Sequence, residues 1–504
     1  MSETLAPAVE GARQHTAAEA SDGRGDAPRP LFLIVFAAVV VRALTSLYLP
    51  SVVYPDETFQ LIEQANRVVT GHGLVPWEFQ VGARSWLLPG LLVPLLAAGR
   101  ALSSDPRVAL GFVTAAMTAV SVACVWSAYV IGSKTGDRLA GLFAAGLVGL
   151  WSELVYFSPH VLADTVSGAL LLGGLAACAA PGRPRRLFWS GLLLGAALVV
   201  RVQLAPAIGL AGLMICGRDV RRYLAMGAGF ALPVAALGLV DWLTWGAPFQ
   251  SVLVYLKLNS SGVADVFGRS PPFFYLQCES LIWGFAGPLV VVTAYFGAKR
   301  AHLIAASAAA IVLTFSLVGH KELRFIYPAL LLIFVLCGVG SAEIVRTVRA
   351  SVADNGLRRA TPIALSLLWV LASAASAAGP VMRPLWLRDG GVLRAFDAVN
   401  ADPQSCGLAL ARAAWLRTGR SRLRSDLQLY PATATESAYN YVLAFSVSPA
   451  AAPSRGGFML QACYGPDGGC LYKRSGACVA GAPPLRADPP AEVDRVLRTL
   501  GLGR

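Results

Sequence analysis

The sequence has few charged residues and lacks the short motifs of the common soluble nucleotide and metal enzymes. Charged side chains make up 14% of its 504 residues, whereas 56% are hydrophobic, and the mean hydropathy is +0.59. A soluble globular domain carries about 25% charged residues, so this composition excludes a soluble protein. The sequence contains no Walker motif, dinucleotide fingerprint, H-E-x-x-H pair or internal repeat.

Long apolar runs are what the sequence does contain. A helix needs about 20 mostly apolar residues to cross a bilayer, and the runs predict an all-α polytopic membrane protein with about eleven such helices. The predicted spans lie near residues 31–49, 108–131, 139–157, 162–180, 187–203, 204–217, 223–241, 281–298, 301–318, 325–345 and 361–380.

The net charge of +13 would indicate nucleic-acid binding in a soluble protein. Here the basic residues gather in short loops between apolar runs, which is typical of cytoplasmic loops, so no nucleic-acid partner is predicted. Residues 86–103 are apolar enough to cross the membrane, but a crossing there would reverse the side of every later loop. They are therefore predicted to form an interfacial or re-entrant helix.

Three regions follow from this pattern. Residues 1–30 are predicted to be a disordered cytoplasmic tail, and residues 31–380 a membrane domain. The membrane domain is expected to have a first outer loop at 50–107, with interfacial helices, and a second large outer loop at 242–280. Residues 381–504 are predicted to form a small extracytoplasmic α/β domain.

Four of the nine cysteines lie in this C-terminal region, whereas the others lie in or beside apolar runs. In an extracytoplasmic domain four cysteines predict two disulfides, with three possible connectivities. Zinc is the alternative, but the spacing lacks paired C-x2-C elements and the region has no histidine, so disulfides are favoured and no metal site is predicted. The four are Cys406, Cys463, Cys470 and Cys478.

Two adjacent carboxylates, Asp56 and Glu57, follow the first apolar run. Pro55 favours a helix start and Gly71 a helix end, so residues 55–69 are predicted to form a helix near the membrane surface. Adjacent residues on a helix point about 100° apart, so one carboxylate is expected to be catalytic and the other structural. Helix-start chemistry alone, where acidic residues are common, is the alternative. A polar stripe facing substrate is expected from Asp56, Gln60, Glu63 and Arg67.

A second cluster places three basic side chains, His320, Lys321 and Arg324, beside Glu322. The predicted topology puts them outside, where the positive-inside bias does not require cations, so a bound anion explains them more simply. Arg binds phosphate through two parallel hydrogen bonds and Lys binds it as a point charge, while Glu322 is expected to orient the cluster. Snorkelling side chains at a helix end are the alternative.

Four further charged residues are candidates. Arg84 is a phosphate ligand in one interpretation and a solvated charge or a partner of Glu78 in the other. Arg201, at the outer end of a span, and Arg42, inside the first span, are functional candidates because ionisable groups in a membrane usually have a role. For Arg42 an internal salt bridge is the alternative.

Three segments of this chain together resemble glycosyltransferase family 22, the polytopic mannosyltransferases that extend the GPI core and the N-glycan precursor from dolichyl-phosphate mannose. The resemblance covers roughly residues 31–345. The chain departs from the family at Tyr54, where the family often has His. The matching segments are Tyr54-Pro55-Asp56-Glu57, then Trp77-Glu78-Phe79 with Arg84-Ser85-Trp86 and Pro89, and His320-Lys321-Glu322-Leu323-Arg324-Phe325 with Pro328.

The resemblance implies a GT-C fold for the membrane domain and an inverting transfer of mannose from a polyprenyl- or dolichyl-phosphate donor to a glycan or glycolipid hydroxyl. Asp56, with Glu57 beside it, would be catalytic. No cofactor is required, although a divalent metal is compatible with the chemistry. The expected donor-phosphate and substrate residues are Glu78, Arg84, Arg201, His320, Lys321, Glu322 and Arg324.

The active site and the C-terminal domain would face the outer or lumenal side, in the plasma membrane of a bacterium or the endoplasmic reticulum of a eukaryote. The partners would be the lipid-linked donor, the acceptor and membrane lipids. A transporter or flippase for lipid-linked glycans is the rival hypothesis. Repeated halves, which are common in transporters, are missing from the sequence, and the charged candidates gather at one membrane face.

Overall fold

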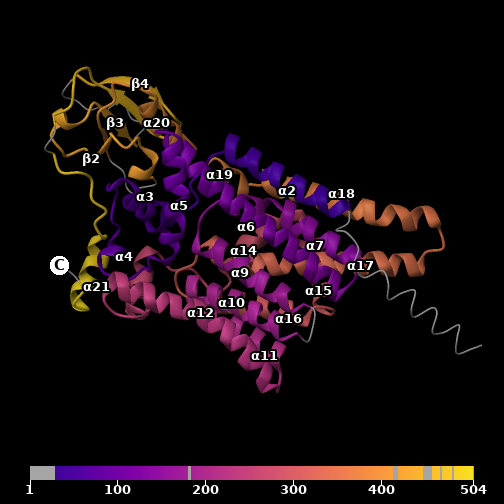
Figure 1. Ribbon diagram of the computed structural model, residues 1–504. Helices are drawn as coiled ribbons and strands as arrows, with labels where there is room; N and C mark the ends of the chain where they lie inside the picture. Colours follow the sequence, from indigo (N-terminus) through magenta and orange to yellow (C-terminus); the bar gives the residue numbers. More distant parts are fainter. Residues whose placement is uncertain are drawn as a thin grey trace, which may run out of the picture.

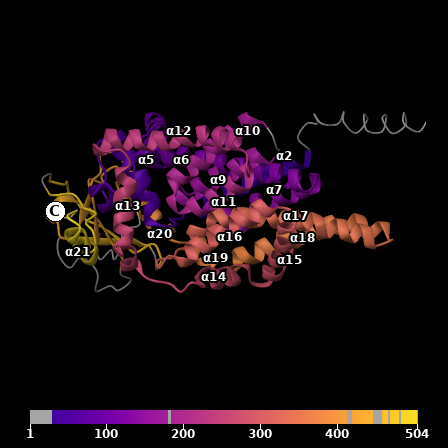
Figure 2. The same ribbon diagram turned by 90° about the horizontal axis from the view of Figure 1, so that it is seen from below.

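The computed structural model describes residues 29–179, 183–411, 418–445, 457–465, 468–479 and 482–502. The predicted N-terminal tail lies almost wholly outside these residues. The protein is a bundle of helices with a small sheet at one end (Figure 1). The loop between α17 (Tyr327–Ser351) and α18 (Asn355–Ala378) projects from the opposite end, in both views (Figures 1 and 2).

The bundle is built from helices of very different length. Besides α17 and α18, the longer helices are α2 (Arg29–Tyr48), α5 (Leu87–Leu102), α6 (Pro106–Thr135), α7 (Arg138–Leu150), α9 (Ala163–Cys178), α10 (Pro184–Val200), α11 (Ala205–Cys216), α12 (Val220–Trp245), α13 (Gln250–Ser260), α14 (Phe274–Trp283), α15 (Gly287–Ala298) and α16 (His302–Leu317). Short helices lie between them, namely α3 (Glu63–Thr70), α4 (Trp77–Gln80), α8 (Ser152–Phe157) and α19 (Met382–Trp386).

Within the described residues, six helical runs are long and apolar enough to cross a membrane: 29–48, 106–135, 220–245, 274–298, 323–351 and 355–378. Five further apolar helices are shorter, including α5 at residues 87–102. The expected count of about eleven spans is therefore not confirmed. Breaks that the hydropathy pattern does not reveal interrupt several apolar runs. The run at 139–157, for example, divides at Trp151 into α7 and α8.

Glycine allows the helices to approach closely. A Cβ atom on Gly191 of α10 would lie 1.9 Å from the carbonyl oxygen of Met226 on α12, and one on Gly297 of α15 would lie 2.0 Å from that of Leu336 on α17. No side chain fits at either crossing. Helices in lipid associate by such backbone proximity, since lipid provides little hydrophobic driving force between them.

Arg42, the charged residue inside the first span, is part of the bundle framework. Its side chain is 1% exposed. It donates hydrogen bonds to the Ser121 hydroxyl (2.7 Å) and to the carbonyl oxygens of Gly149 (2.5 Å) and Ala38 (3.1 Å). Because α7 ends at Leu150, Arg42 satisfies carbonyl groups that a helix end leaves unpaired. These partners are neutral groups, so the internal salt bridge that was the alternative role for Arg42 does not form with them.

The helix predicted at residues 55–69 forms, and it ends at Gly71, whose φ of 74° is left-handed. Near its start, residues Glu57–Ile62 form a π-helix, which changes the direction of the side chains beyond it. Glu63 is consequently fully buried, so the prediction that it joins a polar stripe facing substrate is wrong.

The C-terminal region contains a five-stranded mixed sheet, in agreement with the predicted small α/β domain. The strand order is β2-β1-β3-β5-β4, with β1 parallel to β2 and β3, and β5 antiparallel to β3 and β4. Residues of α20 (Gly390–Ala401) share the hydrophobic core of the sheet. The strands are β1 (Leu408–Ala411), β2 (Leu429–Pro431), β3 (Tyr441–Ala444), β4 (Met459–Cys463) and β5 (Cys470–Lys473).

The four cysteines of this region pair as Cys406–Cys478 and Cys463–Cys470. The prediction of two disulfides is confirmed, and disulfides rather than zinc occupy these side chains. The first disulfide joins the residues just before β1 to the segment that leads out of the sheet. That segment ends in α21 (Ala491–Thr499), which packs beside α13, as Figure 2 shows.

Glu63 joins the first loop to the C-terminal domain. Its carboxylate accepts hydrogen bonds from three backbone N–H groups, those of Leu74, Arg420 and Ser421, each at 2.9 Å. The backbone at residue 419 lies so close to Glu63 that only glycine fits there, because a Cβ would lie 2.6 Å from the Glu63 carboxylate. One buried side chain therefore fixes the domain above the loop that carries Asp56.

We expect Glu63→Ala to loosen the C-terminal domain. The change leaves three N–H groups without an acceptor, and each unsatisfied buried group costs about 1–3 kcal/mol. Limited proteolysis in detergent should release the domain faster than from the wild type. Glu492→Ala, at an exposed position of α21, is the matched control and should leave the cleavage rate unchanged. Equal rates for the Glu63 variant would contradict this docking role.

Candidate active site

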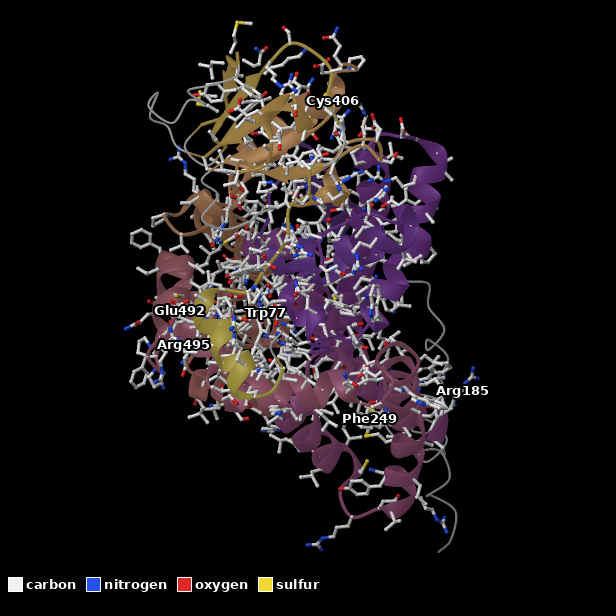
Figure 3. All side chains as sticks on the ribbon, turned by 90° about the vertical axis from the view of Figure 1, so that its left-hand side faces the viewer. Trp77, Arg185, Phe249, Cys406, Glu492 and Arg495 are labelled. Atoms are coloured by element: carbon white, nitrogen blue, oxygen red, sulfur yellow. A yellow bond between two sulfur atoms is a disulfide. The ribbon has the colours of Figure 1, made fainter. Side chains whose placement is uncertain are left out.

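A cavity of about 960 Å³ lies between the helical bundle and the C-terminal domain. Its floor includes the predicted helix at Asp56, and its opposite wall includes Thr433 and Asp488 of the C-terminal region. Figure 3 looks at this end of the molecule: α21 lies beside Trp77, which lines the cavity, while Glu492 and Arg495 point outward. The predicted site residues that line the cavity are Asp56, Glu78, Arg84, Arg201, His320, Glu322 and Arg324.

Asp56 forms an ion pair with Arg324 at the base of this cavity. The carboxylate is one-third exposed, whereas the guanidinium is only 6% exposed. Burial alone would raise the pKa of the Asp56 carboxyl, but the charges of Arg324 and Arg84 outweigh it and hold the pKa below its usual value. Asp56 is therefore an ionised carboxylate that a ligand in the cavity can reach.

Arg324 connects three acidic residues and one ring. Its Nε lies 2.5 Å from a carboxylate oxygen of Glu322 and 3.8 Å from one of Asp164, and its Nη2 contacts the carboxylate of Asp56. The guanidinium carbon stands 4.4 Å from the centroid of the Tyr54 ring, which is within cation–π range. Tyr54 thus has a clear place in the site even though it departs from the family pattern.

Two more guanidinium groups line the cavity. Arg201 pairs with Asp164 (3.0 Å) and lies 4.5 Å from the centroid of Phe325. Arg84 lies 5.4 Å from the centroid of Tyr255. In the described part of the chain its buried Nε has no hydrogen-bond partner, and no acidic group lies within 4 Å of it. Arg84 consequently retains donors for a ligand.

His320 supplies charge rather than a free donor. Its two ring nitrogens lie 3.1 Å from two acceptors, the Glu322 carboxylate and the Gly268 carbonyl oxygen, an arrangement that suits the doubly protonated ring. The hydrogen bond to Glu322 raises the pKa of His320. For Glu322 burial acts to raise the pKa, but the Arg324 charge and the His320 hydrogen bond outweigh it and lower the pKa.

Two of the predicted substrate residues contact other protein groups. Lys321 does not line the cavity; its ammonium group donates to the carbonyl oxygens of Ser270 (3.0 Å) and Val318. Glu78 lines the cavity but accepts a hydrogen bond from Gln60 (2.9 Å), and burial raises its pKa. Lys321 therefore contacts the backbone of its own loop and of Ser270, and it does not face the cavity.

Glu57 faces away from Asp56, as the angle between neighbouring helix positions predicts. Its carboxylate accepts a hydrogen bond from the Val53 N–H (2.8 Å) and lies 2.8 Å from His160 Nδ1. Glu57 is 5% exposed and does not line the large cavity. These contacts are typical of a structural residue. They do not support the assignment of Glu57, together with Asp56, as a catalytic residue.

A narrower groove of about 110 Å³ shares eight lining residues with the large cavity, Asp56 among them, and then continues between helices. The shared residues include Arg84 and Arg201, whereas the rest of the lining is mostly aliphatic, with Leu88, Val200 and Leu237 among its residues. The groove therefore changes from charged to apolar along its length, which is the profile of a lipid that carries an anionic head group.

The sequence analysis missed Asp164 and His160. Asp164 is fully buried in α9 and pairs with Arg201 and Arg324. A carboxylate inside an apolar run is itself a signal of function, so Asp164 could have been found. His160 lies 103 positions from its partner Glu57, and no spacing rule joins residues so far apart.

Comparison with known proteins gives a family match over most of the chain. Residues 31–382 match the model of the Alg9-like mannosyltransferase family. The chain is 27% identical over 330 residues to GPI mannosyltransferase 3 of Yarrowia lipolytica, and 25% identical over 316 residues to GPI alpha-1,2-mannosyltransferase 3 of Danio rerio. These alignments span 59% and 61% of this chain, and 59% of each relative.

A solved structure has a similar fold. ArnT from Cupriavidus metallidurans, bound to undecaprenyl phosphate, superposes with a TM-score of 0.57 at 14% sequence identity, covering 88% of this chain and 97% of ArnT. This likeness supports the expected GT-C fold. With a family match over most of its length, the chain belongs to the Alg9-like mannosyltransferase family.

Proposed function

We propose that the protein is an inverting mannosyltransferase that moves mannose from a polyprenyl-phosphate donor to a hydroxyl of a glycan or glycolipid. The observation that carries the proposal is the position of ionised Asp56 among three arginines, where a large cavity meets a groove with an apolar end. The names of the two relatives, which are GPI mannosyltransferases, support mannose as the transferred sugar.

The chemistry needs a base on one side of the anomeric carbon and positive charge on the other. The acceptor oxygen forms a bond to C1 of mannose while the bond from C1 to the phosphate oxygen breaks. The acceptor proton moves to Asp56, and the electron pair of the broken bond leaves with the polyprenyl phosphate. Attack opposite the leaving group inverts a β-linked donor to an α-mannoside. A positioned base contributes about 100- to 10,000-fold.

The leaving phosphate is assigned to Arg84 and Arg201. Both line the cavity and the groove, and Arg84 has donors without partners among the described residues. Arginine binds phosphate through two parallel hydrogen bonds, and such contacts stabilise charge strongly in a site that excludes water. The polyprenyl chain would follow the aliphatic part of the groove. Since guanidinium groups supply the positive charge, the step does not need a metal.

The acceptor is assigned to the rest of the cavity, whose far wall belongs to the C-terminal domain. We place this end of the molecule on the outer or lumenal side, because the adjoining ends of α17 and α18, which carry Arg346, Arg349, Arg358 and Arg359, project from the other end (Figure 1). Short basic loops favour the cytoplasm. The charged residues of the site gather at one end, which favours a one-sided enzyme over a transport path.

The direct test is transfer of labelled mannose from polyprenyl-phosphate mannose to mannoside acceptors by the full chain in detergent. We expect an alkali-stable glycoside with α configuration, and no transfer from GDP-mannose. Added polyprenyl phosphate should inhibit as a product. Transfer from the nucleotide donor alone, or retention of configuration, would overturn the proposal, and no transfer with any donor would restore the transport hypothesis.

The dependence of kcat/KM on pH should be bell-shaped. Asp56 must be ionised, and because its pKa is lowered the acid limb should lie below about pH 3.9, the usual value for Asp. The pKa of His320 is raised, so its positive charge should persist above about pH 6.5 and be lost as the pH rises further. His320→Gln should abolish the alkaline limb, and an unchanged limb would contradict the role of this histidine.

A further inference from the structure

A second pocket, of about 160 Å³, lies on the other side of the helix that carries Asp56. It is enclosed by the outer end of α2, by α6, by Trp386 at the end of α19 and by the C-terminal domain. Asp56 lines the large cavity, whereas Glu57 lines this second pocket. The mechanism proposed above uses no residue of the second pocket.

The walls of the second pocket combine hydroxyl groups and two aromatic rings with aliphatic side chains such as Leu110 and Val113. Ser46 of α2, Thr114 of α6 and Thr418 of the C-terminal domain all line it. Tyr156 and Trp386 meet edge to face, with ring centroids 5.1 Å apart and an interplanar angle of 76°. Together the rings form an apolar corner beside these hydroxyl groups.

Several buried polar atoms on residues of this pocket have no hydrogen-bond partner in the described part of the chain. Among them are the Ser46 hydroxyl, the Trp386 Nε1 and the Arg422 Nε. Buried donors without an acceptor cost free energy, and a polar ligand would supply the missing acceptors. Several such donors in one pocket indicate a ligand with several hydroxyl oxygens.

The charged side chains of the pocket already have partners. Glu57 contacts His160 (2.8 Å) and the Val53 N–H, and Arg422 contacts Asp397 (3.2 Å). A phosphate would need positive charge that remains free, as Arg84 offers in the large cavity. The walls therefore favour a neutral ligand that has many hydroxyl groups and one apolar face, which is the chemistry of a pyranose ring.

We propose that the second pocket is a non-catalytic binding site for one neutral hexose unit. The ring would stack in the corner of Tyr156 and Trp386, and its hydroxyls would bond to Ser46, Trp386 and Arg422. The unit can come from a sugar of the acceptor that is not being modified or from a separate glycolipid. Only the first source rests on the proposed transfer reaction.

Saturation-transfer NMR with methyl α-D-mannopyranoside on the full chain in detergent tests the site. Thr433→Trp, which fills part of the catalytic cavity, provides the background. We expect saturation of the sugar ring protons in this background and loss of most of the signal when Ser46→Leu is added. Ser127→Leu, on α6 outside the pocket, is the matched control and should retain the signal. Trp386→Phe, which keeps an aromatic ring but lacks the N–H, should weaken it.

An equal signal with the Ser46 and Ser127 variants, or none with the wild type, would overturn the proposal. Competition by inorganic phosphate would overturn the assignment to a neutral sugar.

Transfer kinetics identify the molecule that supplies the bound hexose. If the hexose belongs to the acceptor, Ser46→Leu raises the acceptor KM for a tetramannoside but not for methyl mannoside. If a separate glycolipid supplies it, both KM values stay constant while sugar binding is lost. Because binding is measured without transfer, failure of the proposed reaction would leave this result readable.

Discussion

Asp56→Asn should reduce kcat for mannosyl transfer by about 100- to 10,000-fold, the contribution of a positioned general base. The amide has the shape of the carboxylate and can still accept a hydrogen bond from Arg324, but it cannot take the proton of the acceptor. The donor KM should change little, because the phosphate is assigned to Arg84 and Arg201. The measurement is steady-state transfer together with the thermal midpoint in the same detergent, which shows that the variant is folded.

Glu57→Gln is the matched control, since it makes the same chemical change at the adjacent position. In the wild type the Glu57 carboxylate contacts His160 and the Val53 N–H. We therefore expect the Glu57→Gln variant to have a lower thermal midpoint and a kcat within a few fold of the wild-type value. Equal losses of kcat in the two variants would mean that Glu57 shares the catalytic role after all. Full activity of Asp56→Asn would refute the assignment of the base.

That Asp56 and Glu57 point in different directions could be predicted, because helix geometry separates adjacent side chains whatever surrounds them. Which of His320, Lys321 and Glu322 face the cavity could not be predicted. Glu322 has an extended backbone, with φ −135° and ψ 148°, and successive side chains of an extended segment point in opposite directions. His320 and Glu322 therefore face the cavity while Lys321 turns to the backbone of Ser270 and Val318. The sequence alone does not reveal where the helix begins.

Partners distant in sequence account for most of the remaining differences. Glu63 looked like part of a polar stripe, but its acceptor atoms are used by the backbone of residues 420 and 421, which the chain brings back more than 350 positions later. Asp164 lies in α9, and its partner Arg201 follows the end of α10. Burial of such groups depends on how the helices pack. The apolar character of the membrane domain and the presence of two disulfides depend on composition and compartment, so they could be predicted from the sequence, whereas the pairing of the four cysteines could not.

Arg324→Gln should be the most disruptive single change in the membrane domain. The guanidinium is 6% exposed and contacts the carboxylates of Asp56, Glu322 and Asp164. Removing one partner of a buried ion pair typically costs about 3–5 kcal/mol, because the remaining charge is left without compensation. We expect a large drop in the thermal midpoint and no detectable transfer. Arg346→Gln is the control: Arg346 also contacts two carboxylates, Asp137 and Glu343, but is 33% exposed, so its loss should cost about 1 kcal/mol or less.

Loss of stability alone would explain an inactive Arg324 variant, so a second substitution is needed to separate folding from catalysis. Glu322→Gln removes the carboxylate that lies 2.5 Å from Arg324. In the double variant Arg324→Gln/Glu322→Gln, we expect the thermal midpoint to recover in part, because one stranded charge has gone. Transfer should stay at least about 100-fold below wild type, since Asp56 keeps neither the positive neighbour that lowers its pKa nor the contact that fixes its position. If transfer recovers together with the midpoint, Arg324 serves only the fold, and the electrostatic support of the catalytic base must come from Arg84 and Arg201.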